Sequence, residues 1–127
     1  MFKTVLFPID HSREAVETAN KAIQLAKNHQ SHIIMLSILQ PERPEMENSE
    51  LVTSLLEKVQ EQIELAGLTC EILKKEGNPA FVICDIADDL EVDVIVMGTR
   101  GINMELDAES TASRVIQLAP CPVLVVP

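Results

Sequence analysis

The sequence predicts a doubly wound α/β domain, in which five parallel strands form one sheet with helices on both faces. Short apolar segments alternate with longer segments whose apolar residues recur at helical spacing. Most of the short segments carry apolar residues on both faces, as strands covered on both sides require. No repeat, linker or low-complexity tract interrupts the alternation, so we expect residues 1–127 to form a single domain.

The first unit is a strand followed by a helix rich in alanine. Residues 2–9 (FKTVLFPI) are apolar and β-branched, which predicts a buried strand that ends before Asp10. Ser12 is placed to cap a helix that continues to Asn28. Small apolar residues recur along one side of this helix, so we expect that side to pack on the sheet.

The second unit repeats this order with a longer connection. Residues 32–39 (HIIMLSIL) predict a strand that is covered on both faces. Residues 40–49 are polar and contain two prolines, which indicates a surface loop. Residues 50–66 have helical periodicity, and Gly67 stands where a C-terminal cap belongs.

The third unit begins with the alternating strand 68–73 (LTCEIL). Asn78 followed by Pro79 marks the start of a helix, because proline at the first helical position sacrifices no hydrogen bond. We expect five apolar residues to form the inner face of this helix: Val82, Ile83, Ile86, Ala87 and Leu90.

The last two strands are predicted at residues 92–97 (VDVIVM), where Gly98 ends the run, and at residues 123–126 (VLVV). Residues 110–119 between them predict a short helix. Its expected inner face consists of Val115, Ile116 and Leu118.

Composition argues against several classes of function. Ten Lys and Arg against twenty Asp and Glu give a net charge of −10, which disfavours binding to nucleic acid or to anionic membranes. No apolar run approaches the roughly 20 residues of a membrane span, and no leader is apparent. The thiols Cys70, Cys84 and Cys121 have no metal-binding spacing, so we expect a cytoplasmic protein with reduced cysteines and no metal site.

A ligand site is expected where the order of the strands reverses. In doubly wound sheets ligands bind beyond the carboxyl ends of the strands at that point, which for the order 3-2-1-4-5 lies between the first and fourth strands. Two groups of residues meet there: Pro8, Ile9, Asp10 and His11 after the first strand, and Met97, Gly98, Thr99, Arg100 and Gly101 after the fourth.

Several of these residue types are suited to a phosphorylated ligand. Gly98 and Gly101 allow backbone amides to approach an anion, and the helix start at Ser110 and Thr111 adds further donors. Asp10 can accept hydrogen bonds from a ribose. Simpler interpretations remain open, because a Gly-x-x-Gly pair also forms tight turns. Asp10 can likewise join the helix cap, and Arg100 can be a solvated charge.

Three segments together resemble the universal stress protein family over nearly the whole chain: FPIDHSREA (7–15), VDVIVMGTRG (92–101) and SRVIQLAPCPVLVVP (113–127). The resemblance implies a Rossmann-like fold of the adenine nucleotide alpha hydrolase type with strand order 3-2-1-4-5. It also implies a homodimer formed by antiparallel pairing of the last strand, which here consists of Val123, Leu124, Val125 and Val126.

The family contains members that bind ATP and members that do not, and this chain departs from the ATP-binding signature. That signature is Gly-x2-Gly-x9-Gly followed by Ser or Thr, and Gly98 and Gly101 match its first two glycines. Counting nine residues further gives Thr111, whereas alignment backward from Arg114 puts Glu109 at the glycine and Ser110 at the hydroxyl position. Neither alignment provides a third glycine.

The missing glycine weakens the expected site for a triphosphate. A carboxylate about 5 Å from a phosphate opposes binding by roughly 3 kcal/mol at an effective dielectric constant near 20, which is about a hundredfold in affinity. Mg²⁺ that bridges Glu109 to the phosphates, or a Glu109 side chain that points into solvent, would relieve this repulsion.

The nucleoside half of the site is better preserved. By resemblance, Asp10 matches the acidic residue at the adenosine moiety, and Ile38 matches a position whose backbone contacts adenine, with Met97 beside them. AMP or a cyclic nucleotide is therefore expected to bind with less impairment than ATP.

Two functions follow from the sequence. The first is a stress-response protein that acts as a dimeric interaction module with a degenerate nucleotide pocket. The second is a regulatory switch in which ATP or AMP orders residues 98–110. An enzyme is disfavoured because the sequence shows neither a nucleophile paired with a base nor a glycine-rich loop with Lys before Ser or Thr. We therefore expect any slow hydrolysis of ATP to be incidental.

Overall fold

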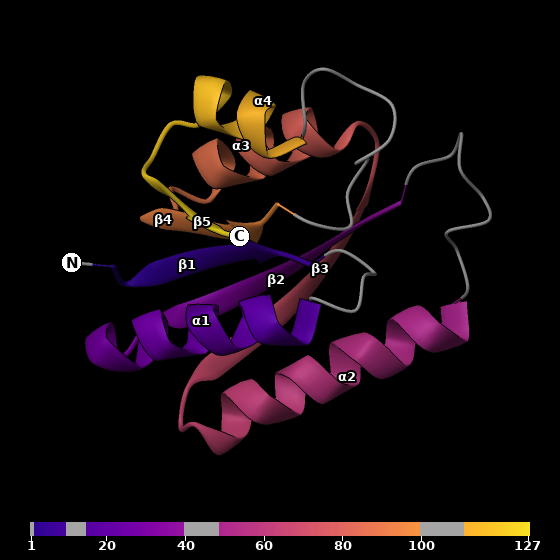
Figure 1. The fold of residues 1–127 in the computed structure, drawn as a ribbon, viewed down its shortest axis with the longest axis vertical. Helices are drawn as coiled ribbons and strands as arrows, with labels where there is room; N and C mark the ends of the chain where they lie inside the picture. Colours follow the sequence, from indigo (N-terminus) through magenta and orange to yellow (C-terminus); the bar gives the residue numbers. More distant parts are fainter. Residues whose placement is uncertain (1, 10–14, 40–48, 100–110) are drawn as a thin grey trace.

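One parallel sheet forms the centre of the computed structural model, which describes residues 2–9, 15–39, 49–99 and 111–127 (Figure 1). Its strands lie in the order β3-β2-β1-β4-β5, which confirms the predicted fold class. The strands are β1 (Thr4–Pro8), β2 (His32–Leu39), β3 (Thr69–Glu76), β4 (Val94–Gly98) and β5 (Val123–Val126).

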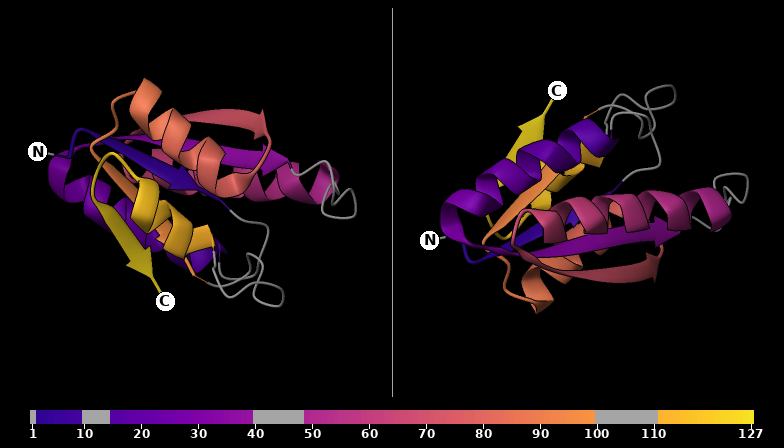
Figure 2. Two further views of the ribbon diagram at one scale, coloured as in Figure 1. Left: turned by 90° about the horizontal axis from the view of Figure 1, so that it is seen from above. Right: turned by 90° about the horizontal axis from the view of Figure 1, so that it is seen from below.

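Helices cover both faces of the sheet (Figures 1 and 2). On one face lie α1 (Ala15–His29) and α2 (Ser49–Leu65), and on the other lie α3 (Pro79–Asp89) and α4 (Thr111–Leu118). Among the described residues, no helix is long and apolar enough to cross a lipid bilayer.

The alternation of side chains along the strands divides the core in two. Val5 and Phe7 of β1 face α1 and α2, whereas Leu6 between them faces α3 and α4. All three side chains are at most 1% exposed, as expected for a strand covered on both faces. The remaining central strands follow the same rule, so each face contributes its own buried cluster.

Small side chains bring α1 close to the sheet. Ala15, Ala19, Ala22 and Ala26 recur at helical spacing and are almost completely buried. Thr18 lies on the same buried side and is its only polar member among the described residues of α1. Since alanine projects a single methyl group, the axis of α1 can approach β1 and β4 closely.

Two predicted helix ends have the expected geometry. Gly67 has a φ of +81°, its amide donates to Glu64 O at 2.9 Å, and the Leu68 amide donates to Ile63 O at 3.2 Å, the bonds of a Schellman cap. At the start of α3, the Asn78 side chain accepts a hydrogen bond from the Phe81 amide. These caps fix where α2 ends and α3 begins.

Several predicted boundaries and inner-face residues are wrong. β3 continues to Glu76 rather than ending at residue 73, because its last residues pair with β2 along its whole length. Leu90, Ile116 and Leu118 are 44%, 56% and 50% exposed, although helical spacing assigned them to inner faces. α3 ends at Asp89, so Leu90 lies beyond the helix, and the short α4 buries only Thr111, Ala112 and Val115.

The contrast within α4 can be tested by paired truncations. We expect Val115→Ala to reduce the free energy of unfolding by about 2 kcal/mol, because Val115 is fully buried and its loss leaves a cavity. Ile116→Ala is expected to change it by less than about 0.5 kcal/mol. Urea unfolding of both variants measures the difference, and equal losses would contradict the observed orientation of α4.

Candidate functional site

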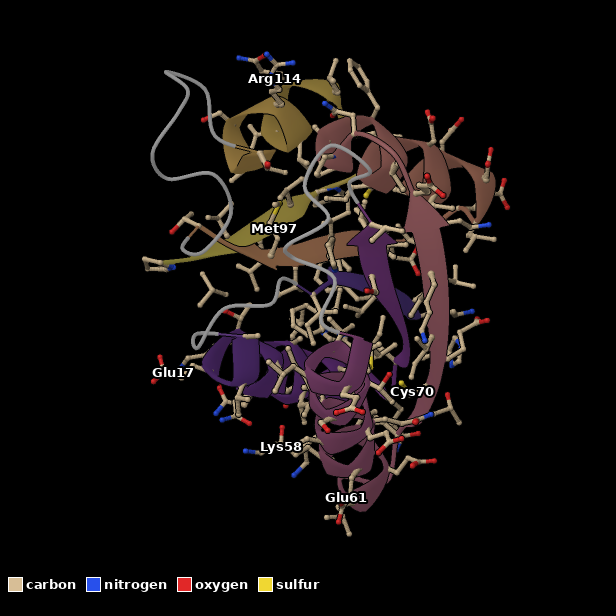
Figure 3. All side chains as sticks on the ribbon, turned by 90° about the vertical axis from the view of Figure 1, so that its right-hand side faces the viewer. Glu17, Lys58, Glu61, Cys70, Met97 and Arg114 are labelled. Atoms are coloured by element: carbon tan, nitrogen blue, oxygen red, sulfur yellow. The ribbon has the colours of Figure 1, made fainter. Side chains whose placement is uncertain are left out.

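The carboxyl ends of β1 and β4 meet at the point where the strand order reverses. Leu6 pairs with Ile95, so the parallel register brings Pro8 beside Met97. Pro8, Ile9, Met97 and Gly98 are all buried. Figure 3 shows Met97 in the layer of the sheet, between α4 and α1.

Pro8 provides a physical reason for the strands to separate here. The Ile9 amide donates to Leu36 O of β2 at 2.9 Å, so the backbone nitrogen of Pro8 faces the opposite neighbour, β4. Proline has no amide hydrogen and cannot donate to that neighbour. The pairing of β1 with β4 ends at Leu6, whereas pairing with β2 continues to Pro8. The pairing of β1 with β4 therefore ends two residues earlier than its pairing with β2, on the side where the ligand site is predicted.

Gly98 ends β4 in close contact with α1. A Cβ atom at this position would lie 3.0 Å from Thr18 Oγ1 and 3.8 Å from Val126 O. Its φ is not in the left-handed region, so close packing rather than backbone freedom explains a glycine here. The next amide, that of Thr99, donates to Val126 O at 3.2 Å and ties this corner to β5.

Two further predicted residues lie on the α3 and α4 side of the sheet. Ile38 lies within β2, one residue before its end, and packs against the same apolar cluster as Met97. Thr111 is the first residue of α4 and is buried. The helix dipole gives this end of α4 a partial positive charge, which favours an anion.

The other predicted site residues lie outside the described residues: Asp10, Arg100, Gly101, Ser110 and the substituted Glu109. Their assignment to a nucleotide site therefore stays a prediction. Residues 40–48 of the expected surface loop also lie outside the described part, whereas Ser49 begins α2.

A polar cluster that sequence analysis did not find lies at the opposite end of the sheet. His32 Nδ1 is 2.7 Å from Thr69 Oγ1, and His32 Nε2 is 3.0 Å from Glu71 Oε1. A carboxylate only accepts, so a neutral His32 donates from Nε2 and accepts the Thr69 hydroxyl at Nδ1. The cluster connects β2 to the edge strand β3, and the pairing of His32 with Thr69 becomes evident only from the strand register.

The cysteines carry no activated nucleophile. Burial, together with the charges of Glu64 and Glu71, raises the pKa of Cys70 from 9.0 to about 11. Burial is also the main reason that the pKa values of Cys84 and Cys121 are raised. All three thiols are free, and at neutral pH they remain protonated. The described residues contain no cluster of three side chains that could hold a metal ion.

Comparison with known proteins gives one consistent family. The family description "Universal stress protein family" matches residues 1–127. A universal stress protein of Synechocystis is 44% identical to this chain, with 100% of the chain and 87% of that protein covered. One from Methanocaldococcus jannaschii is 32% identical, with 99% of the chain and 82% of that protein covered.

Solved structures share the fold. The universal stress protein UspA from Lactobacillus plantarum superposes with a TM-score of 0.82 at 24% identity, covering 99% of this chain and 98% of that one. A universal stress protein in complex with cAMP gives 0.80 at 21% identity and 98% and 96% coverage. The protein from Archaeoglobus fulgidus in complex with dAMP gives 0.77 at 22% identity and 100% and 98% coverage.

The raised pKa of Cys70 predicts a loss of stability in alkali. The pKa of the Cys70 thiol is about 11 in the folded protein, whereas an unperturbed thiol in the unfolded chain has a pKa near 9.0. The stability that Cys70 contributes is therefore complete below about pH 9 and disappears as the pH rises towards 11. Urea unfolding at a series of pH values measures this loss. We expect the free energy of unfolding of Cys70→Ala to fall less steeply between about pH 9 and 11 than that of the native protein. The free energy of unfolding of Leu65→Ala, which changes an exposed position, should fall as steeply as that of the native protein. Parallel declines for the native protein and Cys70→Ala would refute this effect.

Proposed function

Because the chain belongs to the universal stress protein family, we propose that it is a cytoplasmic stress-response protein that acts as a dimeric interaction module. We further propose that it has a degenerate adenine-nucleotide pocket at the carboxyl ends of β1 and β4, in which nucleoside monophosphates bind better than ATP. No catalytic role is proposed.

The observation that carries the pocket is the end of pairing between β1 and β4 at Leu6, two residues before Pro8. Pro8 cannot donate towards β4, and Gly98 brings bare backbone to the same corner. Thr111 begins α4, and the positive end of that helix dipole favours an anion. These features support a ligand between β1 and β4, as in other doubly wound sheets.

The preference for a monophosphate rests on sequence and on solved relatives. The third glycine of the ATP signature is replaced at Glu109 or Thr111, depending on the alignment. A negative side chain there would repel a triphosphate more strongly than a single phosphate. Two proteins of the same fold were solved in complex with cAMP and with dAMP, and both ligands carry one phosphate.

The dimer is supported by the difference between the two edges of the sheet. β3 ends in three exposed charged residues, Lys74, Lys75 and Glu76, which discourage pairing with another chain. β5 has no charged residue, and its Leu124 is 42% exposed. Figure 2 shows β5 at the outer side of the sheet. An uncharged apolar edge favours strand pairing with a second copy.

The alternative function is a nucleotide-dependent switch. Its specific support is the hydrogen bond from the Thr99 amide to Val126 O, which links the proposed pocket to the proposed dimer edge. Occupancy of the pocket could then change the strength of pairing along β5. A slow ATP hydrolase is a weaker alternative, because the His32 cluster lies at the other end of the sheet and the cysteines remain protonated.

Nucleotide titration by calorimetry tests the pocket. We expect AMP to bind more tightly than ATP, and ATP with Mg²⁺ to bind with a Kd weaker than about 100 μM, because Glu109 opposes the additional phosphates. Glu109→Gly is expected to improve ATP affinity by up to about a hundredfold and to leave AMP affinity much less changed. Glu57→Gln removes a carboxylate on the exposed side of α2 and serves as the charge control. Submicromolar binding of ATP by the native protein would overturn this ranking.

Light scattering tests the dimer. We expect a dimer at micromolar concentration, and Leu124→Lys should shift it towards monomer, because it places a charge on the exposed edge strand. We substitute Leu124 and not Val125, because Leu124 is exposed whereas Val125 is half-buried. Leu65→Lys introduces the same charge at an exposed position on α2 and should leave the dimer intact. A native monomer at this concentration would refute the proposal.

A further inference from the structure

The carboxyl end of β4 is held between two other elements. Thr18 of α1 lies beneath Gly98, with its Oγ1 3.0 Å and its Cγ2 3.8 Å from where a Cβ atom at position 98 would be. On the other side, Gly98 pairs with Val126 of β5, and the Thr99 amide donates to Val126 O. Gly98 therefore has a neighbour on each side, and Thr99 is hydrogen-bonded to β5.

Thr18 lies close enough to Gly98 to limit which residues fit at position 98. Real Cβ atoms rarely approach a neighbour within 3.0 to 3.4 Å, so an alanine at position 98 would have to displace Thr18 or the end of β4. Thr18 is 5% exposed and is packed among the small residues of α1, which leaves it little room to move. Thr18 therefore opposes any side chain larger than that of glycine at position 98.

We propose that Thr18 is a positioning residue for the nucleotide site. It fixes the distance between α1 and the backbone of Gly98 and Thr99, and thereby the position at which the segment expected to face the phosphate begins. This inference rests on the proposed function for its ligand. In this proposal Thr18 acts through the backbone of Gly98 and not by contact with the nucleotide. Glycine at position 98 has a role in helix packing, in addition to the close approach to an anion that the sequence suggested.

A double-variant cycle tests the proposal with AMP as the ligand. We expect Gly98→Ala to weaken AMP binding about tenfold, because the added methyl group pushes the segment away from α1. Thr18→Ala leaves a gap beneath Gly98 and should weaken binding about threefold, whereas Thr18→Ser keeps the contacting Oγ1 and should bind like the native protein. Gly98→Ala combined with Thr18→Ala should bind as well as Thr18→Ala alone, since the new methyl group fills the gap.

A second measurement does not depend on a ligand. Hydrogen exchange of the Thr99 amide, followed by NMR, reports whether its bond to Val126 O is kept. We expect exchange to be about tenfold faster in Gly98→Ala and to return towards the native rate in the double variant. Thr69→Ala, an exposed threonine at the far end of the sheet, should change neither exchange at Thr99 nor AMP binding.

The two measurements separate the possible failures. Additive losses in the double variant, by exchange or by AMP affinity, would overturn the positioning role of Thr18. If Gly98→Ala does not fold, equal AMP binding and equal Thr99 exchange in Thr18→Ala and Thr18→Ser would overturn it as well. If the native protein binds no AMP, the proposed function fails, and Thr99 exchange alone then decides whether Thr18 positions this segment.

Discussion

The close approach of α1 to the sheet determines the geometry around the crevice. Four alanines on the inner side of α1 project only methyl groups, so the helix lies near β1 and β4. At its beginning, however, Thr18 is larger than alanine, and the strand that it meets ends in Gly98. The larger side chain of Thr18 thus lies opposite a residue that has none. A larger residue at position 98 would conflict with a packing arrangement that every turn of α1 supports.

The second constraint is a missing hydrogen-bond donor. Parallel strands normally continue their ladder as long as both have amides to donate. Pro8 interrupts this on the β4 side only, because its neighbour Ile9 still donates to Leu36 of β2. β1 therefore pairs with β2 as far as Pro8 but with β4 only as far as Leu6. One proline at the end of a strand thus shortens the ladder on one side and leaves it intact on the other.

Sequence patterns predicted the parts of this fold that depend on local chemistry. β2 and β5 have the expected bounds, and the caps at Gly67 and Asn78 form as their residue types suggest. Inner faces were less predictable, since Ile116 has helical spacing but α4 is too short to bury it. The last residues of β3 are charged, which is typical of a loop, but their pairing with β2 extends the strand to Glu76.

Within the site, the sequence indicated which residues end β1 and β4, but not what lies beneath them. The contact of Thr18 with Gly98 joins positions 80 residues apart, and the hydrogen bond from Thr99 to Val126 joins a different pair of elements. Such contacts depend on helix placement and strand register, which no local pattern contains. The same holds for His32 and Thr69, whose proximity follows from the register of β2 with β3.

The two candidate functions differ in one quantity, the coupling free energy between the crevice and the β5 edge. The hydrogen bond from the Thr99 amide to the Val126 carbonyl connects the two directly. If pairing along β5 leaves this bond unchanged, coupling is close to zero, and the protein is an interaction module whose pocket is independent. If pairing along β5 strengthens this hydrogen bond, nucleotide binding and dimerisation favour each other by the same free energy, because linkage is reciprocal. A coupling of about 1–3 kcal/mol, the usual range for allosteric proteins, would suffice for a switch. The rigidity of the corner at which Thr99 meets Val126 therefore decides whether the protein is an interaction module or a switch.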